Sequence, residues 1–153
     1  MSLRDRVNIA LTAAMRSQNA ARRDALRMVL AAVQRAEKEG HHELSDDEML
    51  AVLTRELKVR NESLEAFRGG SREDLAAREE AAIAVISEFM PQPLGKAELE
   101  ALVAQAIAET GVASPREMGK VMSWLGPKTR GRADGKTVAA LVSQHLAARA
   151  AGS

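Results

Sequence analysis

The sequence predicts an all-α protein, and three observations support this class. Alanine accounts for 29 of the 153 residues, and Leu, Arg, Lys and Glu are also abundant, all of which favour helices. Only two Phe and one Trp are present, so the core must consist of Leu, Val, Ile, Met and Ala. Apolar residues recur at spacings of three and four along most of the chain, which is typical of amphipathic helices.

The first 90 residues predict four helices that form an N-terminal bundle. The side chain of Asn19 is suited to capping the second helix, and a left-handed Gly40 is expected to end it. Ser45 and Glu48 have the spacing of a capping box at the start of the third. The expected helices run from about Ser2 to Ser17, Asn19 to Gly40, Ser45 to Gly69-Gly70, and from a capping Ser71 to about Phe89.

The stretch EFMPQPLG, residues 88–95, predicts a boundary between two domains. Pro91 and Pro93 each disfavour helix at the preceding residue, so we take 91–95 as a linker. Residues 96–150 then predict a small bundle of three helices. The first ends at Gly111, the second runs from the cap Ser114 to about Leu125 and stops at Gly126-Pro127, and the third begins at the cap Asp134.

The net charge is only +1, but its distribution along the chain is uneven. Residues 1–36 carry seven Arg against two Asp, which is typical of a solvated helix face. Residues 116–136 carry six basic residues against Glu117 and Asp134. The second block therefore marks the stretch to test for binding of an anionic partner.

Several classes of site are disfavoured. The chain has no cysteine, which excludes disulfides, zinc thiolates and cysteine nucleophiles. No apolar run has the length of a membrane span, and the N-terminus has no apolar signal segment, so we expect a cytoplasmic protein without membrane contact. His41, His42 and Glu43 read as a polar turn rather than a metal site. We expect no metal, no cofactor and no self-contained catalytic set.

The stretch from Gly131 to Thr137 superficially resembles a nucleotide-binding loop. It reads G-x-x-x-G-K-T, one residue short of the phosphate loop, and no strand precedes it. Asp134 would also repel a phosphate. We therefore do not expect a nucleotide site here.

The same basic stretch fits the phosphates of a polynucleotide better. Lys128, Arg130 and Arg132 alternate in what we expect to be an extended loop, so they would project to one side. Lys136 falls in the first turn of the following helix, whose free amides and positive dipole end attract anions. A solvated turn between two helices explains the composition equally well. The adjacent Trp124 could stack on a base, although packing at the core or its rim is favoured.

Two longer segments resemble the YqeY family. They are EFMPQPLGKAELEALVAQAIAETG and MGKVMSWLGPKTRGRADGKTVAALV, and the N-terminal helices also look like those of this family. The resemblance covers essentially the whole chain. Two departures are Phe89-Met90 before the first proline and Gly95 where a capping Ser is usual.

The C-terminal part is similar to the tail domain of GatB, the B subunit of the bacterial glutamyl/aspartyl-tRNA amidotransferase. The resemblance implies two different helical bundles and contact with tRNA. The catalytic part of GatB is absent from this chain, so the label of a carbon–nitrogen ligase with glutamine as amido donor comes from the family alone. The resemblance places Gly119, Lys120, Lys128, Arg130, Gly131, Arg132, Ala133 and Asp134 on the shared motif. With Lys136 from the following helix, the residues that we expect to bind nucleic acid are Lys120, Lys128, Arg130, Gly131, Arg132 and Lys136.

Three hypotheses follow from the sequence. In the first, the chain is an accessory protein that grips tRNA or another structured RNA through these residues, with a second contact from the arginines of the first two helices. Neutralising about four phosphates predicts a log–log salt slope of about −3 to −4, which charge removal at Lys128, Arg130 and Arg132 should flatten. In the second, the Gly-Lys-Val-Met helix docks an amidotransferase or aminoacyl-tRNA synthetase. In the third, the chain is an enzyme or enzyme subunit.

Overall fold

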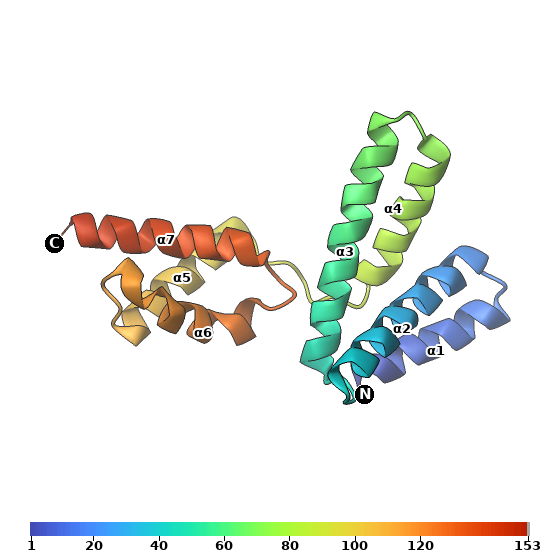
Figure 1. Cartoon of the computed structure of the whole chain (residues 1–153), viewed down its shortest axis with the longest axis horizontal. Coiled ribbons are helices and arrows are strands. Elements are labelled where there is room, and N and C mark those ends of the chain that lie inside the picture. Colours follow the sequence, from blue (N-terminus) through green and yellow to red (C-terminus); the bar gives the residue numbers. More distant parts are fainter. Residues whose placement is uncertain (153) are drawn as a thin grey trace. The chain divides into compact units, whose positions relative to one another are not determined.

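The computed structural model describes residues 1–152 and confirms the all-α class (Figure 1). Within these residues there is no strand. The α-helices are α1 (Leu3–Arg16), α2 (Ala20–Gly40), α3 (Asp46–Gly69), α4 (Glu73–Ser87), α5 (Lys96–Thr110), α6 (Met118–Thr129) and α7 (Gly135–Ala151), and the short 3-10 helix η1 (Pro115–Glu117) precedes α6. No helix in the described part is long and apolar enough to cross a membrane.

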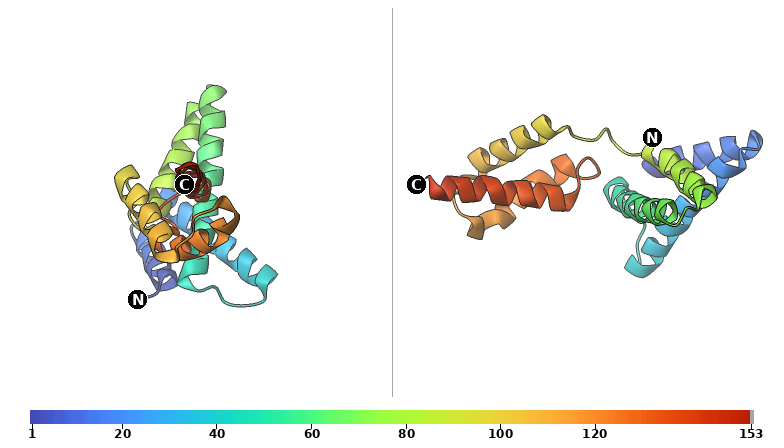
Figure 2. Two further views of the ribbon diagram at one scale, coloured as in Figure 1. Left: turned by 90° about the vertical axis from the view of Figure 1, so that its left-hand side faces the viewer. Right: turned by 90° about the horizontal axis from the view of Figure 1, so that it is seen from above.

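The chain divides into two compact units, Met1–Met90 and the part from Pro91 onward. The first unit consists of two helical hairpins, α1–α2 and α3–α4, which diverge from a common base (Figures 1 and 2). Its core consists of aliphatic side chains and one phenylalanine. The buried members are Leu3, Val7, Ala14, Leu26, Val29, Ala32, Val33, Met49, Val52, Leu53, Ile86 and Phe89.

The second unit packs α5, α6 and α7 around a core of its own. Each helix contributes one buried stripe, because its apolar residues recur every three or four positions. The buried members are Leu99, Val103, Ala106, Ile107, Val112, Val121, Leu125, Val138, Val142 and Leu146. Trp124 lies at the edge of this core and is half-buried.

The predicted caps are largely confirmed. The Asn19 side chain accepts a hydrogen bond from the Arg22 amide at the start of α2. Ser45 and Glu48 form the expected capping box at the start of α3, with both reciprocal hydrogen bonds present. Gly111 ends α5 with φ +69°, the left-handed conformation that glycine adopts without steric cost.

The predicted role of Gly40 was wrong by one residue. Gly40 is the last residue of α2, and His41 takes the left-handed conformation with φ +57°. The reason is the position of His42, whose Nδ1 lies 2.9 Å from the Gly40 carbonyl oxygen. A Cβ on Gly40 would meet the His42 ring at 3.1 Å, so the glycine makes room for the folded-back imidazole.

Ser71 does not cap α4, contrary to expectation. It has φ +58°, and Arg72 occupies the cap position without a side-chain hydrogen bond. The Arg72 amide donates to the Phe67 carbonyl and the Ser71 amide to the Arg68 carbonyl. These two bonds form a Schellman motif, so Ser71 serves the end of α3 rather than the start of α4.

The α6 helix also continues past Gly126-Pro127, where we expected it to stop. The steric clash that a proline imposes on the preceding residue involves that residue's Cβ, which Gly126 lacks. Beyond the proline, Thr129 is buried beside the core, and its hydroxyl donates to the Leu125 carbonyl at 3.0 Å. Burial of Leu125 and Thr129 on one face offsets the backbone hydrogen bond that Pro127 cannot donate.

Candidate nucleic-acid interface

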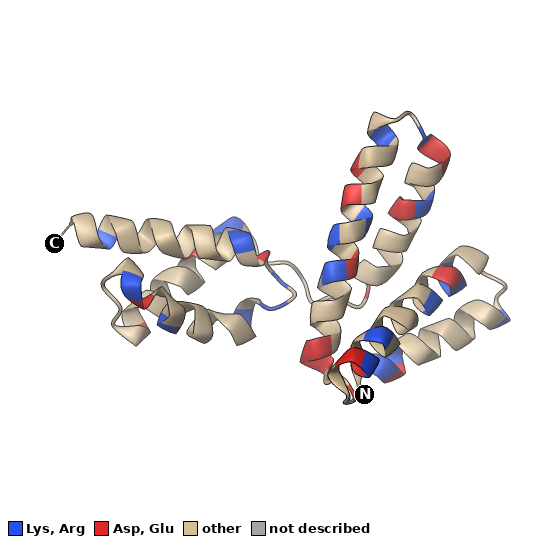
Figure 3. Ribbon diagram, in the orientation of Figure 1, with Lys and Arg blue, Asp and Glu red and all other residues tan. Residues whose placement is uncertain are grey.

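The connection between α6 and α7 holds most of the predicted binding residues. We call residues 128–136 the basic turn. It begins in the last turn of α6, where the amides of Arg132 and Ala133 both donate to the Thr129 carbonyl. Gly131 has φ +73°, which lets the chain reverse direction. Lysine and arginine segments gather at the end of α6, in this connection and at the start of α7 (Figure 3).

Arg132 has a structural role that sequence reasoning did not anticipate. Its Nε donates to the Gln92 carbonyl at 2.9 Å, and its own carbonyl accepts from the Leu94 amide at 2.8 Å. The basic turn and the proline-containing segment are therefore tied together across 40 residues of sequence. Arg132 is half-buried, and its Nε is already engaged, so only its remaining guanidinium nitrogens are left for the predicted anion site.

Lys128 does not lie in an extended loop, contrary to expectation. It is exposed in the last turn of α6, and its Nζ lies 3.9 Å from the centroid of the Trp124 ring. The Trp124 Nε1 donates to the Glu109 carboxylate at 3.1 Å. The ammonium group is thus held by a cation–π contact on the solvent side of α6.

The structure separates Lys120 from the rest of the predicted set. Lys128 lies eight positions further along α6, a rise of about 12 Å. Lys120 is exposed and pairs with Glu117 at 3.2 Å. Arg130 and Lys136, by contrast, lie on the basic turn and are both exposed.

Asp134 changes the electrostatics expected for the start of α7. Its carboxylate accepts hydrogen bonds from the Thr137 amide at 3.2 Å and the Thr137 hydroxyl at 3.3 Å, which confirms the predicted cap. The same negative charge offsets the positive end of the helix dipole. The predicted anion site at the start of α7 would therefore rely on side-chain cations rather than on the free amides of α7.

Lys96 is a basic residue near the turn that sequence reasoning missed. It is the first residue of α5 and lines a groove of about 510 Å³ together with Asp134 and Thr137 of the α7 start. The contacts of Arg132 with Gln92 and Leu94 hold the α5 start at this place. No spacing rule connects residue 96 with residue 134, so only the fold reveals this neighbour.

The two units differ in how far acidic residues balance their basic residues. From Pro91 onward the chain has eight Lys and Arg against five Asp and Glu, a net charge of +3, whereas residues 1–90 have 14 against 16, a net charge of −2. Several arginines of the N-terminal block are engaged within their unit. Arg4 pairs with Glu37, Arg22 pairs with Glu88, and Arg6 lies over the Phe89 ring.

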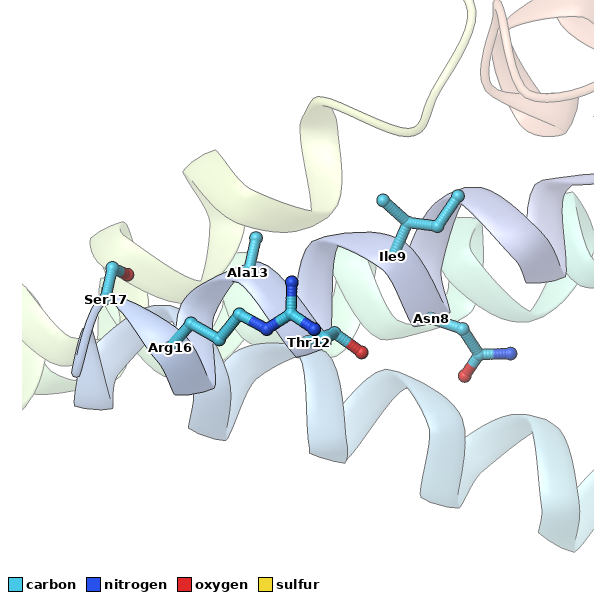
Figure 4. A pocket seen from close by; sticks show the side chains of 6 residues that line it. All are labelled: Asn8, Ile9, Thr12, Ala13, Arg16 and Ser17. Atoms are coloured by element: carbon cyan, nitrogen blue, oxygen red, sulfur yellow. The ribbon is translucent and has the colours of Figure 1, made fainter.

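Other parts of the described chain offer weaker candidates. A shallow pocket of about 720 Å³ lies along α1 (Figure 4) and is lined by one charged residue, Arg16, and five neutral ones. No group of three or more acidic, His or Cys side chains within residues 1–152 is arranged to hold a metal ion. His42 instead pairs with Glu48 at 3.1 Å at the α2–α3 corner.

Comparison with known proteins identifies the family. A match to the family described as Yqey-like protein spans residues 4–146. A Pyrenophora tritici-repentis protein named "Altered inheritance of mitochondria protein 41, mitochondrial" is 28% identical over 130 residues, which cover 84% of this chain and 71% of that protein. An uncharacterized protein of Schizosaccharomyces pombe is 33% identical over 67 residues, 44% of this chain and 54% of that protein. The chain therefore belongs to the YqeY-like family.

Proposed function

We propose that this chain is an accessory protein that binds tRNA or another structured RNA through the basic turn. The observation that carries the proposal is the net charge of +3 of the second unit, with several of its cations close together. Lys128 lies in the last turn of α6, Arg130 follows the end of α6, Lys136 lies in the first turn of α7, and Lys96 lies close by on α5. Closely placed cations of this kind neutralise backbone phosphates and release their counterions. The resemblance of the C-terminal part to the GatB tail domain supports the same ligand.

The test removes charge at three cations of the basic turn. Lys128, Arg130 and Lys136 are changed to Ala, and Arg132 is left intact because it also holds Gln92. A matched control changes Lys38, Arg55 and Lys58, three exposed basic residues of the first unit, so that both variants lose the same net charge. Anisotropy of labelled tRNA is measured at about 50 mM salt.

We expect the basic-turn variant to bind tRNA at least tenfold more weakly than the wild type, because three phosphate contacts are lost. The control is expected to change affinity about twofold or less. Equal losses in the two variants would show that only net charge matters, and would reject the basic turn as the site.

A second candidate function is docking of a protein partner, an amidotransferase or an aminoacyl-tRNA synthetase, on the outer face of α6. Gly119 and Gly126 lie seven residues apart on this face, and a Cβ added to either meets no atom within 4 Å. Glycine inside a helix lowers its stability, so packing within the chain does not explain these two residues. Tight binding of such a partner that survives 0.5 M salt would favour this function over RNA binding.

Two further expectations stay predictions. Glutamine-dependent carbon–nitrogen ligase activity is implied by the resemblance alone, and we expect none from the isolated chain. The expected cytoplasmic location is also untested, and the word "mitochondrial" in the name of the Pyrenophora relative describes that relative.

A further inference from the structure

The position of Trp124 is fixed from one side by the protein. Its ring packs against the core of the second unit, and its Nε1 donates to the Glu109 carboxylate at 3.1 Å. The other Glu109 oxygen accepts from the Gln105 side chain at 3.1 Å. The indole is therefore held in place by α5, and it does not depend on a ligand for its orientation.

A lysine side chain lies over one face of the indole, which we call the outer face. Lys128 follows Trp124 by one helical turn, and its exposed ammonium group lies 3.9 Å from the ring centroid. Lys128 is exposed and Trp124 is half-buried, so this part of the indole lies at the surface of the second unit. Core packing explains the inner contacts of Trp124 but does not explain the contact between its ring and Lys128.

We propose that the outer face of Trp124 is a stacking platform for one unpaired base of the bound RNA. This inference rests on the proposed function, because the basic turn would bring the RNA backbone to the ring. Lys128 would then move from the ring to the phosphate next to the stacked base, and Arg130 lies two residues further along the turn. Exposed aromatic rings beside cations are the usual means of binding single-stranded segments.

The geometry also indicates that the site does not distinguish one base from another. A stacked base presents its flat face to Trp124, and all four bases have such a face. The carboxylate of Glu109 already accepts hydrogen bonds from Trp124 and Gln105. We therefore expect a requirement for an unpaired base with little preference among the four.

The experiment uses the full chain and two labelled RNAs of equal length, a hairpin with an unpaired loop and a fully paired duplex. Trp124 is the only tryptophan, so its fluorescence reports the contact directly. Trp124→Leu removes the aromatic face, and Trp124→Phe keeps a smaller one. Circular dichroism establishes that each variant is folded, and quenching of the wild-type Trp124 fluorescence keeps the test decisive if the Leu variant unfolds.

We expect the hairpin to quench Trp124 fluorescence and to bind the Leu variant roughly tenfold more weakly, within the 5- to 150-fold range of one lost stacking contact. Binding of the duplex is expected to change less than twofold. The Phe variant should retain most of the hairpin affinity, because it still offers a ring.

This experiment distinguishes failure of the stacking platform from failure of the proposed RNA binding. Unchanged hairpin affinity in a folded Leu variant, or a hairpin that binds the wild type without quenching Trp124 fluorescence, would overturn the stacking platform and leave RNA binding in place. An absence of binding to both RNAs by the wild type at low salt would overturn the proposed function and the platform together. Saturable binding of adenosine monophosphate as tight as that of the hairpin would also overturn the platform, since it would indicate a nucleotide pocket.

Discussion

Left-handed residues end several helices of the first unit without being glycine. Within residues 1–152 these are Gln18, His41 and Ser71, with φ of +58°, +57° and +58°. Residues with a Cβ adopt this conformation at a cost of about 1 kcal/mol. At each of these positions glycine would therefore suit the local backbone better than the residue present.

We expect glycine at any one of these positions to raise the free energy of unfolding by about 0.5–1 kcal/mol, since relief of the steric cost exceeds the added freedom of the unfolded chain. Gln34→Gly is the matched control, because Gln34 is exposed within α2 and should lose about 1 kcal/mol. Urea denaturation measures both. If Gln18→Gly, His41→Gly and Ser71→Gly all lowered the free energy of unfolding, backbone strain at these left-handed positions would be contradicted.

The α2–α3 corner is predicted to stabilise the fold in a defined pH range. The Gly40 carbonyl and then Glu48 raise the pKa of His42 above its usual 6.5, with a smaller effect of Glu37. The Ser45 amide and then His42 lower the pKa of Glu48 below its usual 4.5. The His42 contribution is complete below pH 6.5 and is lost as pH rises through the raised pKa. The Glu48 contribution is complete above pH 4.5 and is lost as pH falls.

Replacing His42 with Gln should therefore lower the melting temperature most between about pH 4.5 and 6.5. Well above the raised pKa of His42 the wild type and the variant should converge, because the imidazole is then neutral in both the folded and the unfolded wild type. Thermal melts followed by circular dichroism across pH 4 to 9 measure the difference. A difference that is constant over this range would show that protonation of His42 has no part in it.

At the scale of the helix, α6 shows how much of the local structure follows from the sequence. Capping residues and glycine at Gly111 act within one turn, so the sequence was sufficient to predict the starts of α2, α3 and α7. Gly126-Pro127 was misread because the usual effect of proline on its neighbour requires a Cβ. The role of Arg132 depends on Gln92 and Leu94, 40 and 38 positions away, which no local pattern connects.

The two helical glycines of α6 allow a matched pair of substitutions. Gly119→Ala should stabilise the second unit by about 0.5–1 kcal/mol, because its Cβ meets open space and alanine favours helix. Gly126→Ala also meets open space but is followed by Pro127, so we expect it to be neutral or destabilising. Urea denaturation of the full chain measures both. Equal stabilisation by the two alanines would show that Pro127 imposes no constraint on residue 126.

At the scale of the whole molecule, the two units differ in charge. The first has a net charge of −2 and the second +3, although the first contains more basic residues. Counting arginines along the sequence suggested a second RNA contact in the first two helices. In the structure Arg4 and Arg22 form ion pairs and Arg6 lies over the Phe89 ring, all within the first unit. The number of arginines in the sequence therefore overstates the positive charge that a ligand could contact.

We accordingly expect the remaining arginines of that block to contribute little to RNA binding. Changing the exposed Arg16, Arg27 and Arg35 to Ala should alter tRNA affinity about twofold or less at 50 mM salt, because the surrounding unit is acidic. The comparison is made by anisotropy on the same labelled tRNA as for the basic turn. A tenfold loss would place a second contact on α1 and α2.

The salt dependence of tRNA binding is the most direct test of the basic turn as an RNA site. The affinity of the wild type is measured from about 50 to 300 mM salt, together with the Lys128, Arg130 and Lys136 triple alanine variant. We expect a log–log slope of about −3 to −4 for the wild type and about −1 for the variant, one unit for each phosphate contact removed. The same slope in both proteins, or no binding by the wild type at the lowest salt, would contradict RNA binding through this turn.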